Sequence, residues 1–312
     1  MTQSASSVLL IRPTGFGFDP ETAASNAFQR QLEQQHIRQR AEMEFDELLA
    51  ALRHCGIHTI VLDPVDPAAP NAVFPNNWLS THADGTVVTY PMCTPSRRVE
   101  RDPAIAEVLR HEGFTVRQVM DLSQWEQKGL FLEGTGSLVL DRVKRLAFAV
   151  TSPRTHPSAL NGWCEQLGYV PVPFTATMDG TLSGQPIYHT NVVMSIGLHF
   201  AVVCFDAVPY PAERQELREE LAKAGKAILP ITLEQMHRYA GNMLELRGGR
   251  EGREPFVFLS DTAFHALRPD QRIALEQHAQ LVPVAIPTIE AVGGGSVRCM
   301  LAEVFLPSAI RR

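Results

Sequence analysis

FPNNW, at residues 74–78, is the first of five polar stretches that decide the fold, and it is followed by LEGTGS (132–137), YHTNV (188–192), AGNM (240–243) and GGGSVRC (293–299). Each stretch carries one polar or reactive side chain, and successive ones lie 53 to 57 residues apart: Asn77, Glu133, His189, Asn242 and Cys299. Self-similarity at such a period indicates a supersecondary unit that is repeated around an axis or along a solenoid. The sequence therefore predicts five equivalent units whose signal residues meet at one centre.

Each repeat contains strands and a helix in the same order. After the first stretch, a hairpin with a turn at Asp84 and Gly85 precedes a helix at 102–112 and a strand at 114–119. Alternating helices and strands alone would indicate a doubly wound parallel sheet, but a hairpin in every repeat argues against one. We therefore expect an α/β fold, a five-bladed pseudo-symmetric propeller of ββαβ units, as one domain over residues 1–312.

The segment before the first stretch is predicted to form a strand at 7–12, a long amphipathic helix at 27–54 and a second strand at 58–62. The expected apolar face of that helix consists of Phe28, Leu32, Phe45, Leu48, Leu49 and Leu52. After the last stretch, the apolar run CMLAEVFL starts at Cys299.

The composition is that of a globular protein with ample core, at 45% hydrophobic and 20% charged residues. A net charge of -6 without long runs of one sign argues against nucleic acid or anionic lipid as a partner, and favours a small molecule. Five scattered cysteines without a CxxC pair argue against a disulfide framework or a zinc cluster. With no leader pattern and no apolar run of about 18 residues, we expect a cytoplasmic protein.

Cys299 has the setting of a reactive nucleophile, whereas Cys55, Cys93, Cys164 and Cys204 are expected to be inert core residues. The glycines at 293–295 let the backbone approach closely and present N–H groups. An imidazolium such as that of His189 can lower the pKa of a thiol and then protonate a leaving amine. A carboxylate such as Glu133 can orient the imidazole or bind a substrate nitrogen. These three residues predict nucleophilic catalysis without a metal or organic cofactor.

The ordered stretches, with SPRT at 152–155 and the arginine pair at 97–98, resemble the pentein superfamily of guanidino-group-modifying enzymes over essentially the whole chain. That superfamily includes arginine deiminases, dimethylarginine dimethylaminohydrolases and amidinotransferases. The resemblance implies a five-bladed propeller, the pentein fold. It also implies a covalent intermediate on a catalytic cysteine, Cys299, with His189 as general acid and then base and Glu133 in the substrate pocket.

The resemblance further implies that arginines bind the carboxylate of the substrate. Arg154 matches best, and Arg97 is the second candidate, although the choice between Arg97 and Arg98 stays open at this point. Asn77 and Asn191 stand where arginine deiminases have aspartates that hold the cationic guanidinium. A neutral ureido group has a carbonyl oxygen that needs a donor, and asparagine offers both a donor and an acceptor.

We therefore expect the chain to be closest to the citrulline hydrolase branch, which is often labelled amidinotransferase-like. The expected reaction converts citrulline to ornithine, carbon dioxide and ammonia through an S-carbamoyl intermediate. Deimination of arginine or a methylated arginine, also within arginine metabolism, is the first alternative, and transfer of an amidino group is the second. A non-catalytic pentein, a homo-oligomer, and a lid formed by the loop at 15–19 also stay open.

Overall fold

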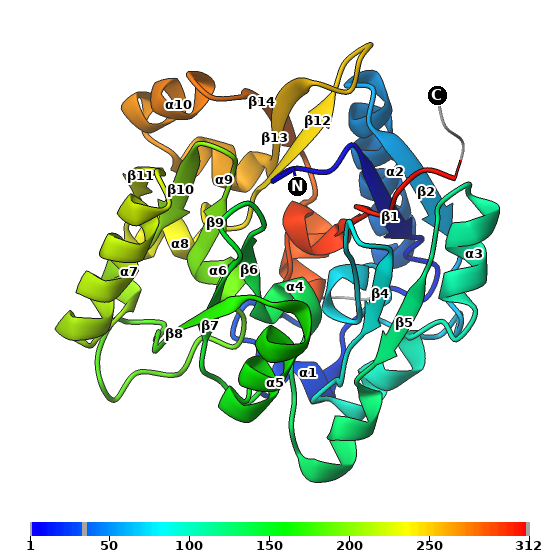
Figure 1. Ribbon diagram of the computed structural model, residues 1–312, viewed down its shortest axis with the longest axis horizontal. Coiled ribbons are helices and arrows are strands. Elements are labelled where there is room, and N and C mark those ends of the chain that lie inside the picture. Colours follow the sequence, from blue (N-terminus) through cyan, green and yellow to red (C-terminus); the bar gives the residue numbers. More distant parts are fainter. Residues whose placement is uncertain (1, 33–35, 310–312) are drawn as a thin grey trace.

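Five small three-stranded sheets surround a common axis in the computed structural model, which describes residues 2–32 and 36–309 (Figure 1). Four sheets use strands that are consecutive in sequence: β3 (Leu79–Thr81), β4 (Thr86–Thr89) and β5 (Gln118–Asp121); β6 (Val139–Asp141), β7 (Leu146–Val150) and β8 (Val170–Phe174); β9 (Met194–Ile196), β10 (Phe200–Val203) and β11 (Ala227–Pro230); β12 (Leu244–Gly248), β13 (Glu254–Ser260) and β14 (Gln280–Val284). The expected propeller of ββαβ units is confirmed.

Within each of these units the first two strands form an antiparallel hairpin, and the third strand pairs in parallel with the second. A parallel partner requires a crossover connection, which an outer helix supplies. The main outer helices lie at the rim of the molecule: α2 (Ile37–His54), α3 (Ile105–His111), α5 (Pro157–Leu167), α7 (Pro211–Lys223) and α10 (Pro269–Glu276) (Figure 1). Shorter helices are α1 (Pro20–Ala23), α4 (Gly134–Ser137), α6 (Thr190–Val193), α8 (Leu233–His237) and α9 (Asp261–Ala266).

The fifth sheet joins the two ends of the chain, in the order β15 (Ala302–Glu303), β1 (Ser7–Ile11) and β2 (His58–Leu62). β15 runs antiparallel to β1, with Leu9 opposite Ala302, and β2 runs parallel to β1. The hairpin of this unit is thus assembled from opposite ends of the sequence. This pairing closes the ring and brings the region of Cys299 against the first units.

Local sequence signals account for the boundaries of individual elements. α5 begins with Pro157, the N–H of Ser158 donates to Nδ1 of His156 at 3.1 Å, and the helix ends before Gly168, which is in the left-handed conformation. The hairpin between β3 and β4 turns at Gly85 with φ +95°, and the carboxylate of Asp84 accepts a hydrogen bond from the N–H of Thr86 at 2.9 Å.

The long helix expected at 27–54 begins only at Ile37, and residues 33–35 lie outside the described part. Upstream, α1 is capped by Asp19, and residues 24–32 are irregular. Phe28 packs against Tyr239, with ring centroids 5.1 Å apart, instead of extending the face of α2. Tertiary contact therefore overrides the helical pattern in this segment.

The core lies between neighbouring sheets and beneath the outer helices. The largest fully buried side chains include Trp78, Trp163, Phe45, Phe148 and Phe258, which come from four of the five units. No described helix combines the length and apolar character that a bilayer crossing requires.

Candidate active site

The five signal residues lie on short turns that precede the inner strands of the units. Asn77 ends the 3-10 turn η1 (Pro75–Asn77), Glu133 and His189 immediately precede α4 and α6, and Cys299 lies in η6 (Val297–Met300). Asn242 follows a turn just before β12. α4 contacts both η1 and α6, and η1 contacts η6, so the turns meet around the axis. The structure therefore brings these distant stretches together, as their period predicts.

Two glycines of LEGTGS allow this convergence. A Cβ on Gly136 would lie 2.4 Å from Nδ2 of Asn77 and 2.8 Å from Nδ1 of His189. A Cβ on Gly134, which has φ +44°, would lie 2.2 Å from the carbonyl oxygen of Asn76. Glycine at these positions lets three units approach one another at the axis.

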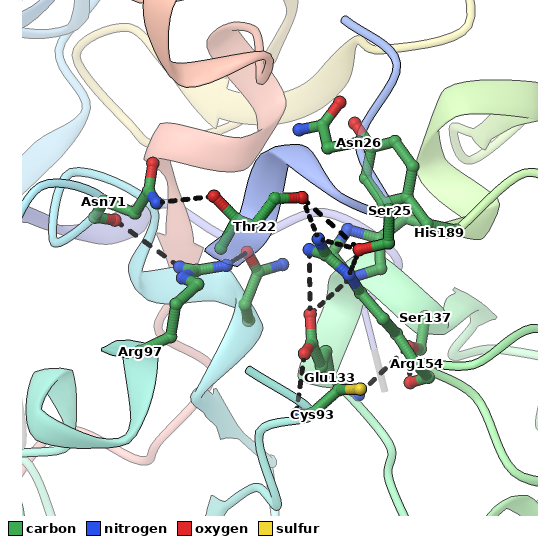
Figure 2. A network of polar contacts seen from close by, with 12 residues as sticks. Thr22, Ser25, Asn26, Asn71, Cys93, Arg97, Glu133, Ser137, Arg154 and His189 are labelled. Carbon is green, nitrogen blue, oxygen red and sulfur yellow. Dashed lines mark hydrogen bonds and ion pairs between the residues drawn. The ribbon is translucent and has the colours of Figure 1, made fainter. Parts of the chain in front are cut away.

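Glu133 forms the charged centre of the site. Its Oε2 lies 2.8 Å from Nε2 of His189 and 3.5 Å from Nη1 of Arg154, and its Oε1 accepts the backbone N–H of Cys93 at 3.0 Å (Figure 2). Complete burial by itself raises the pKa of this carboxyl, but Arg154, His189 and Arg97 outweigh it and lower the pKa to about 2. Glu133 is therefore ionised at neutral pH.

His189 is neutral in the empty site. Burial lowers the pKa of its imidazole to about 4, although the hydrogen bond to Glu133 and its charge act in the opposite direction. An imidazolium that is already present at neutral pH, as considered from the sequence, does not fit this environment. The ring first has to accept a proton before it can act as an acid.

Cys299 is buried, and its hydrogen-bond partners are neutral side chains. Its sulfur accepts hydrogen bonds from Nδ2 of Asn191 at 3.4 Å and from Nδ2 of Asn242 at 3.3 Å. The backbone N–H of Cys299 donates to the carbonyl of Ser296, and that of Gly294 donates to the carbonyl of Glu290. Those two N–H groups are consequently already engaged.

The arginine pair at 97–98 divides into a buried and a half-exposed member. Arg97 lines the cavity and forms a two-point pair with Glu100, through Nε at 2.9 Å and Nη2 at 2.7 Å, while its Nη1 donates to Oδ1 of Asn77 at 2.7 Å. Arg98 instead pairs with Glu126 at 3.2 Å, and its side chain is 34% exposed. The structure thus brings Arg97 to the site and leaves Arg98 outside the lining.

Arg154 binds mainly neutral oxygen atoms. Its Nη2 donates to Oγ of Ser25 at 2.6 Å and to the carbonyl of Thr22 at 3.1 Å (Figure 2). Its guanidinium also lies over the ring of Tyr188, 4.9 Å from the centroid. Arg154 is buried, and its closest charged partner is the carboxylate of Glu133 at 3.5 Å.

A cavity that opens to solvent, with a volume of about 290 Å³ including its opening, is lined by part of these groups but not by Glu133, Asn191 or Asn242. Its lining is Thr22, Asn26, Gln29, Asn71, Phe74, Asn77, Arg97, Arg154, Tyr188, His189, Gly293, Gly294, Gly295 and Cys299. Nδ2 of Asn26 donates to the carbonyl of Gly294 at 3.3 Å, and Nε2 of Gln29 donates to that of Gly293 at 2.9 Å. The segment at 19–30 therefore covers the nucleophile, whereas the sequence drew attention to the loop at 15–19.

Two carboxamide atoms at the site lack a hydrogen-bond partner among the described residues. They are Nδ2 of Asn77 and Oδ1 of Asn191, and both atoms are buried. Buried polar atoms are nearly always paired in folded proteins. One unpaired donor and one unpaired acceptor at the site are therefore places for a ligand or for ordered water.

Several residues of the site have no clear signal in the sequence. Ser25 and Thr22 contact Arg154 from more than 100 positions away. The ion pair between Arg97 and Glu100 could have been predicted from the sequence, because residues three positions apart lie on the same side of a helical turn. Tyr188, adjacent to His189, donates from its hydroxyl to the carbonyl of Gly294 at 3.0 Å.

A family model described as N,N dimethylarginine dimethylhydrolase, eukaryotic, matches residues 12–306. The chain belongs to this family. Membership of the N,N dimethylarginine dimethylhydrolase family confirms the pentein resemblance, and it makes the chain a hydrolase that acts on carbon–nitrogen bonds. Among curated proteins, no significant match to the sequence was found.

Solved structures with low sequence identity share the fold. ArgZ, an arginine dihydrolase from the ornithine-ammonia cycle in cyanobacteria, matches with a TM-score of 0.72 and 14% identity over 97% of this chain. This chain spans 41% of the length of that protein. The separate N-terminal domain of ArgZ matches with a TM-score of 0.70 and 15% identity, covering 96% of this chain and 99% of the domain.

DDAH from Pseudomonas aeruginosa, a cysteine-to-serine variant complexed with citrulline, matches with a TM-score of 0.64 and 14% identity, covering 96% of this chain and 99% of that one. The family description names a methylated arginine. The comparisons therefore support the guanidino alternative better than the citrulline interpretation preferred from the sequence.

Proposed function

We propose that the chain hydrolyses a carbon–nitrogen bond at the guanidino carbon of arginine or a methylated arginine, with Cys299 as the nucleophile. The observation that carries this proposal is the arrangement of Cys299 and His189 around one cavity, with His189 held by the ionised Glu133 at 2.8 Å. A nucleophile, a base and an orienting carboxylate form a complete set for covalent catalysis.

The reaction has two stages. The Cys299 thiolate attacks the guanidino carbon and forms a carbon–sulfur bond, while His189, carrying the proton of the thiol, protonates the leaving nitrogen. Ammonia or a methylamine departs, and a thiouronium remains on Cys299. His189 then takes a proton from water, and the hydroxide adds to the same carbon. The carbon–sulfur bond breaks to release the thiolate, and the hydroxyl proton of the adduct passes to solvent, which leaves citrulline.

Glu133 has the charge needed to orient the substrate. A guanidinium requires carboxylate partners in a buried site, and Glu133 is fully buried and ionised. Arg154 is the better candidate for the carboxylate of the amino acid, because its short contacts are with the neutral oxygens of Ser25 and Thr22. Arg97 is already neutralised by Glu100 at 2.7 Å, so its charge is less available to a ligand.

A second candidate substrate is citrulline, and the unpaired atoms of Asn77 and Asn191 favour it. Nδ2 of Asn77 is a buried donor without a partner among the described residues, and a ureido oxygen would accept from it. A guanidinium has no acceptor to offer. With citrulline, attack of Cys299 expels ornithine, and hydrolysis of the S-carbamoyl enzyme releases carbamate, which decays to carbon dioxide and ammonia.

Product analysis tests the proposal directly. The purified protein is incubated separately with arginine, asymmetric dimethylarginine and citrulline, and citrulline, ornithine, ammonia and dimethylamine are quantified. Citrulline formed from either guanidino substrate supports the main proposal, and ornithine formed from citrulline supports the second candidate. Turnover that requires an added acceptor amine identifies an amidinotransferase. Absence of turnover of all three compounds contradicts both candidates.

A further inference from the structure

Asn242, the signal residue of the fourth unit, contacts the sulfur of Cys299 and has no part in the function proposed so far. Its side chain is buried, and its Nδ2 lies 3.3 Å from Sγ of Cys299 and 3.1 Å from the carbonyl oxygen of Asn191. Its Oδ1 accepts the backbone N–H of Arg298 at 3.1 Å. The carboxamide is therefore bound at both of its ends.

These contacts fix which end of the amide faces the sulfur. If the amide were turned over, Oδ1 would face the carbonyl oxygen of Asn191, and Nδ2 would face the N–H of Arg298. Both contacts would be repulsive, so the hydrogen-bond network assigns the orientation. Oδ1 lies 3.8 Å from Sγ of Cys299, which is long for a thiol donor. The close contact is thus between an N–H donor and the sulfur.

We propose that Asn242 is a catalytic residue of this site, which stabilises the Cys299 thiolate by a hydrogen bond from Nδ2 and holds the sulfur in position for attack. A thiolate is a stronger acceptor than a thiol, so a fixed donor at this distance favours the ionised form. The inference rests on the proposed function, in which Cys299 is the nucleophile. His189 is neutral near pH 7, and the hydrogen-bond donors that contact the sulfur are the neutral amides of Asn191 and Asn242. The other titratable groups that act electrostatically on Cys299 are Arg298, which pairs with Glu303, and the hydroxyls of Tyr188 and Tyr239.

Asn191 provides the internal comparison. Its Nδ2 also donates to the sulfur, at 3.4 Å, but its Oδ1 has no partner among the described residues. The amide of Asn191 is thus anchored at one end, which leaves an acceptor for the substrate, whereas that of Asn242 is anchored at both ends. Asn242 contacts the sulfur and two backbone groups and is not in the lining of the cavity, so its replacement should affect the nucleophile more than the groups that line the cavity.

The experiment measures the rate of alkylation of Cys299 by iodoacetamide as a function of pH, with the labelled residue identified by mass spectrometry. The variants are Asn242→Ala, Asn242→Asp and Asn242→Ser. Asn161→Asp, on the exposed side of α5, is the matched control for the same chemical change. In Asn242→Asp the new carboxylate still accepts the N–H of Arg298 but places negative charge beside the sulfur.

We expect the midpoint of the alkylation profile to move upward by about one pH unit in Asn242→Ala and by more in Asn242→Asp, because a hydrogen bond to a charged group is lost. Asn242→Ser should recover part of the shift, and Asn161→Asp should leave the profile unchanged. If turnover is present, kcat should fall about tenfold to a hundredfold while KM changes by less than about threefold. Unchanged profiles in folded Asn242 variants would overturn the inference.

A measurement on the unaltered protein covers the case in which the variants fail to fold. The side-chain NH₂ resonance of Asn242 should move with pH with the same midpoint as alkylation of Cys299, and a resonance that does not move over that range contradicts the inference. Neither measurement requires a substrate. A shifted profile without turnover of arginine, methylarginine or citrulline would refute the proposed function and leave the role of Asn242 intact.

Discussion

The two halves of the cavity hold their polar groups in different ways. On the side of Glu133, the buried carboxylate pairs with the guanidinium of Arg154 at 3.5 Å and lies 2.8 Å from the neutral imidazole of His189. Around Cys299, the partners of the sulfur are the neutral amides of Asn191 and Asn242. Permanent charges require partners of opposite charge in a buried site. The sulfur gains and loses its charge during the reaction, and neutral donors can serve it in both states.

The neutral surroundings also preserve reactivity. The nucleophilicity of a thiolate falls as the pKa of its thiol falls, so a permanent cation against the sulfur would produce more thiolate but a weaker nucleophile. Arg97 and Arg154 make no hydrogen bond to the sulfur that the structure shows, and the neighbouring Arg298 pairs with Glu303, so no guanidinium is a hydrogen-bond partner of Cys299 among the described residues. The two halves should therefore respond differently to substitution, in activity, in stability and in their dependence on pH.

The largest effect is expected for Cys299→Ser. We expect turnover to fall by about 10⁴-fold or more, because a serine hydroxyl is much less acidic than a thiol and His189 would ionise it far less. The melting temperature should stay close to that of the unaltered protein, since the sulfur has only neutral partners. Product formation and thermal unfolding are the measurements.

Cys164→Ala is the control for Cys299→Ser. Cys164 is a buried residue of α5, where burial raises the pKa of its thiol to about 12. Turnover by this control should stay within about twofold of the unaltered protein, as expected for an inert buried cysteine. A Cys299→Ser protein with turnover similar to the control would show that another residue is the nucleophile.

Glu133→Gln should affect both activity and stability. It removes the charge that pairs with His189 and leaves the buried guanidinium of Arg154 without its carboxylate, so kcat/KM should fall by about 10² to 10³ and the free energy of unfolding by about 3 kcal/mol. Steady-state kinetics and urea unfolding measure the two effects.

Glu126→Gln is the matched control for this substitution. Glu126 pairs with Arg98 and Arg101 outside the lining of the cavity. It should change kcat/KM by less than about twofold, because its ion pairs are partly exposed. Equal losses of activity in the Glu126 and Glu133 variants would mean that Glu133 has only a general structural role.

On the side of Glu133, Arg97→Ala and Arg154→Lys should distinguish an arginine that stabilises the fold from one that binds the substrate. Removing Arg97 leaves Glu100 buried without its two-point partner, so we expect the free energy of unfolding to fall by about 3 kcal/mol. Arg154→Lys keeps the charge but loses the planar geometry that binds a carboxylate, so KM should rise about tenfold with a smaller change in stability. The reverse pattern would make Arg97 the arginine that binds the substrate.

The residues at the centre of the site can be predicted from the sequence better than the segment at 19–30 that covers it. The period locates Glu133, His189 and Cys299, because equivalent positions in a closed ring must face the same axis. It also predicts the hairpins and the outer helices, since their signals are local, such as the turn at Asp84 and Gly85.

Features that depend on contacts between distant residues could not be read from the sequence. The pairing of β1 with β15 joins the two ends of the chain and has no local signal. The segment at 24–32 has a helical pattern but is held irregular by bonds to Gly293, Gly294 and Arg154. The choice between Arg97 and Arg98 depends on which side of η2 (Pro95–Glu100) faces the axis.

The smallest effect is on the dependence of stability on pH, to which the site contributes through His189 and Glu133. The pKa of His189 is about 4 in the folded chain, against an ordinary value of 6.5, so the unfolded chain binds the proton more readily between these values. Stability from neutral His189 is therefore complete above pH 6.5 and is lost as pH falls toward 4. Glu133, with its pKa lowered from 4.5 to about 2, adds a loss in the same direction at lower pH.

Replacement of His189 by asparagine should remove part of this slope. We expect the free energy of unfolding of the unaltered protein to fall more steeply between pH 6.5 and pH 5 than that of His189→Asn, by about 1 kcal/mol per pH unit, which corresponds to one proton. His82, whose pKa burial lowers to about 3, contributes equally to both proteins and cancels in the comparison. Asn242→Ser should leave the slope unchanged, because an amide does not titrate. Parallel curves for the unaltered protein and His189→Asn would show that His189 is not held neutral by its burial beside Glu133.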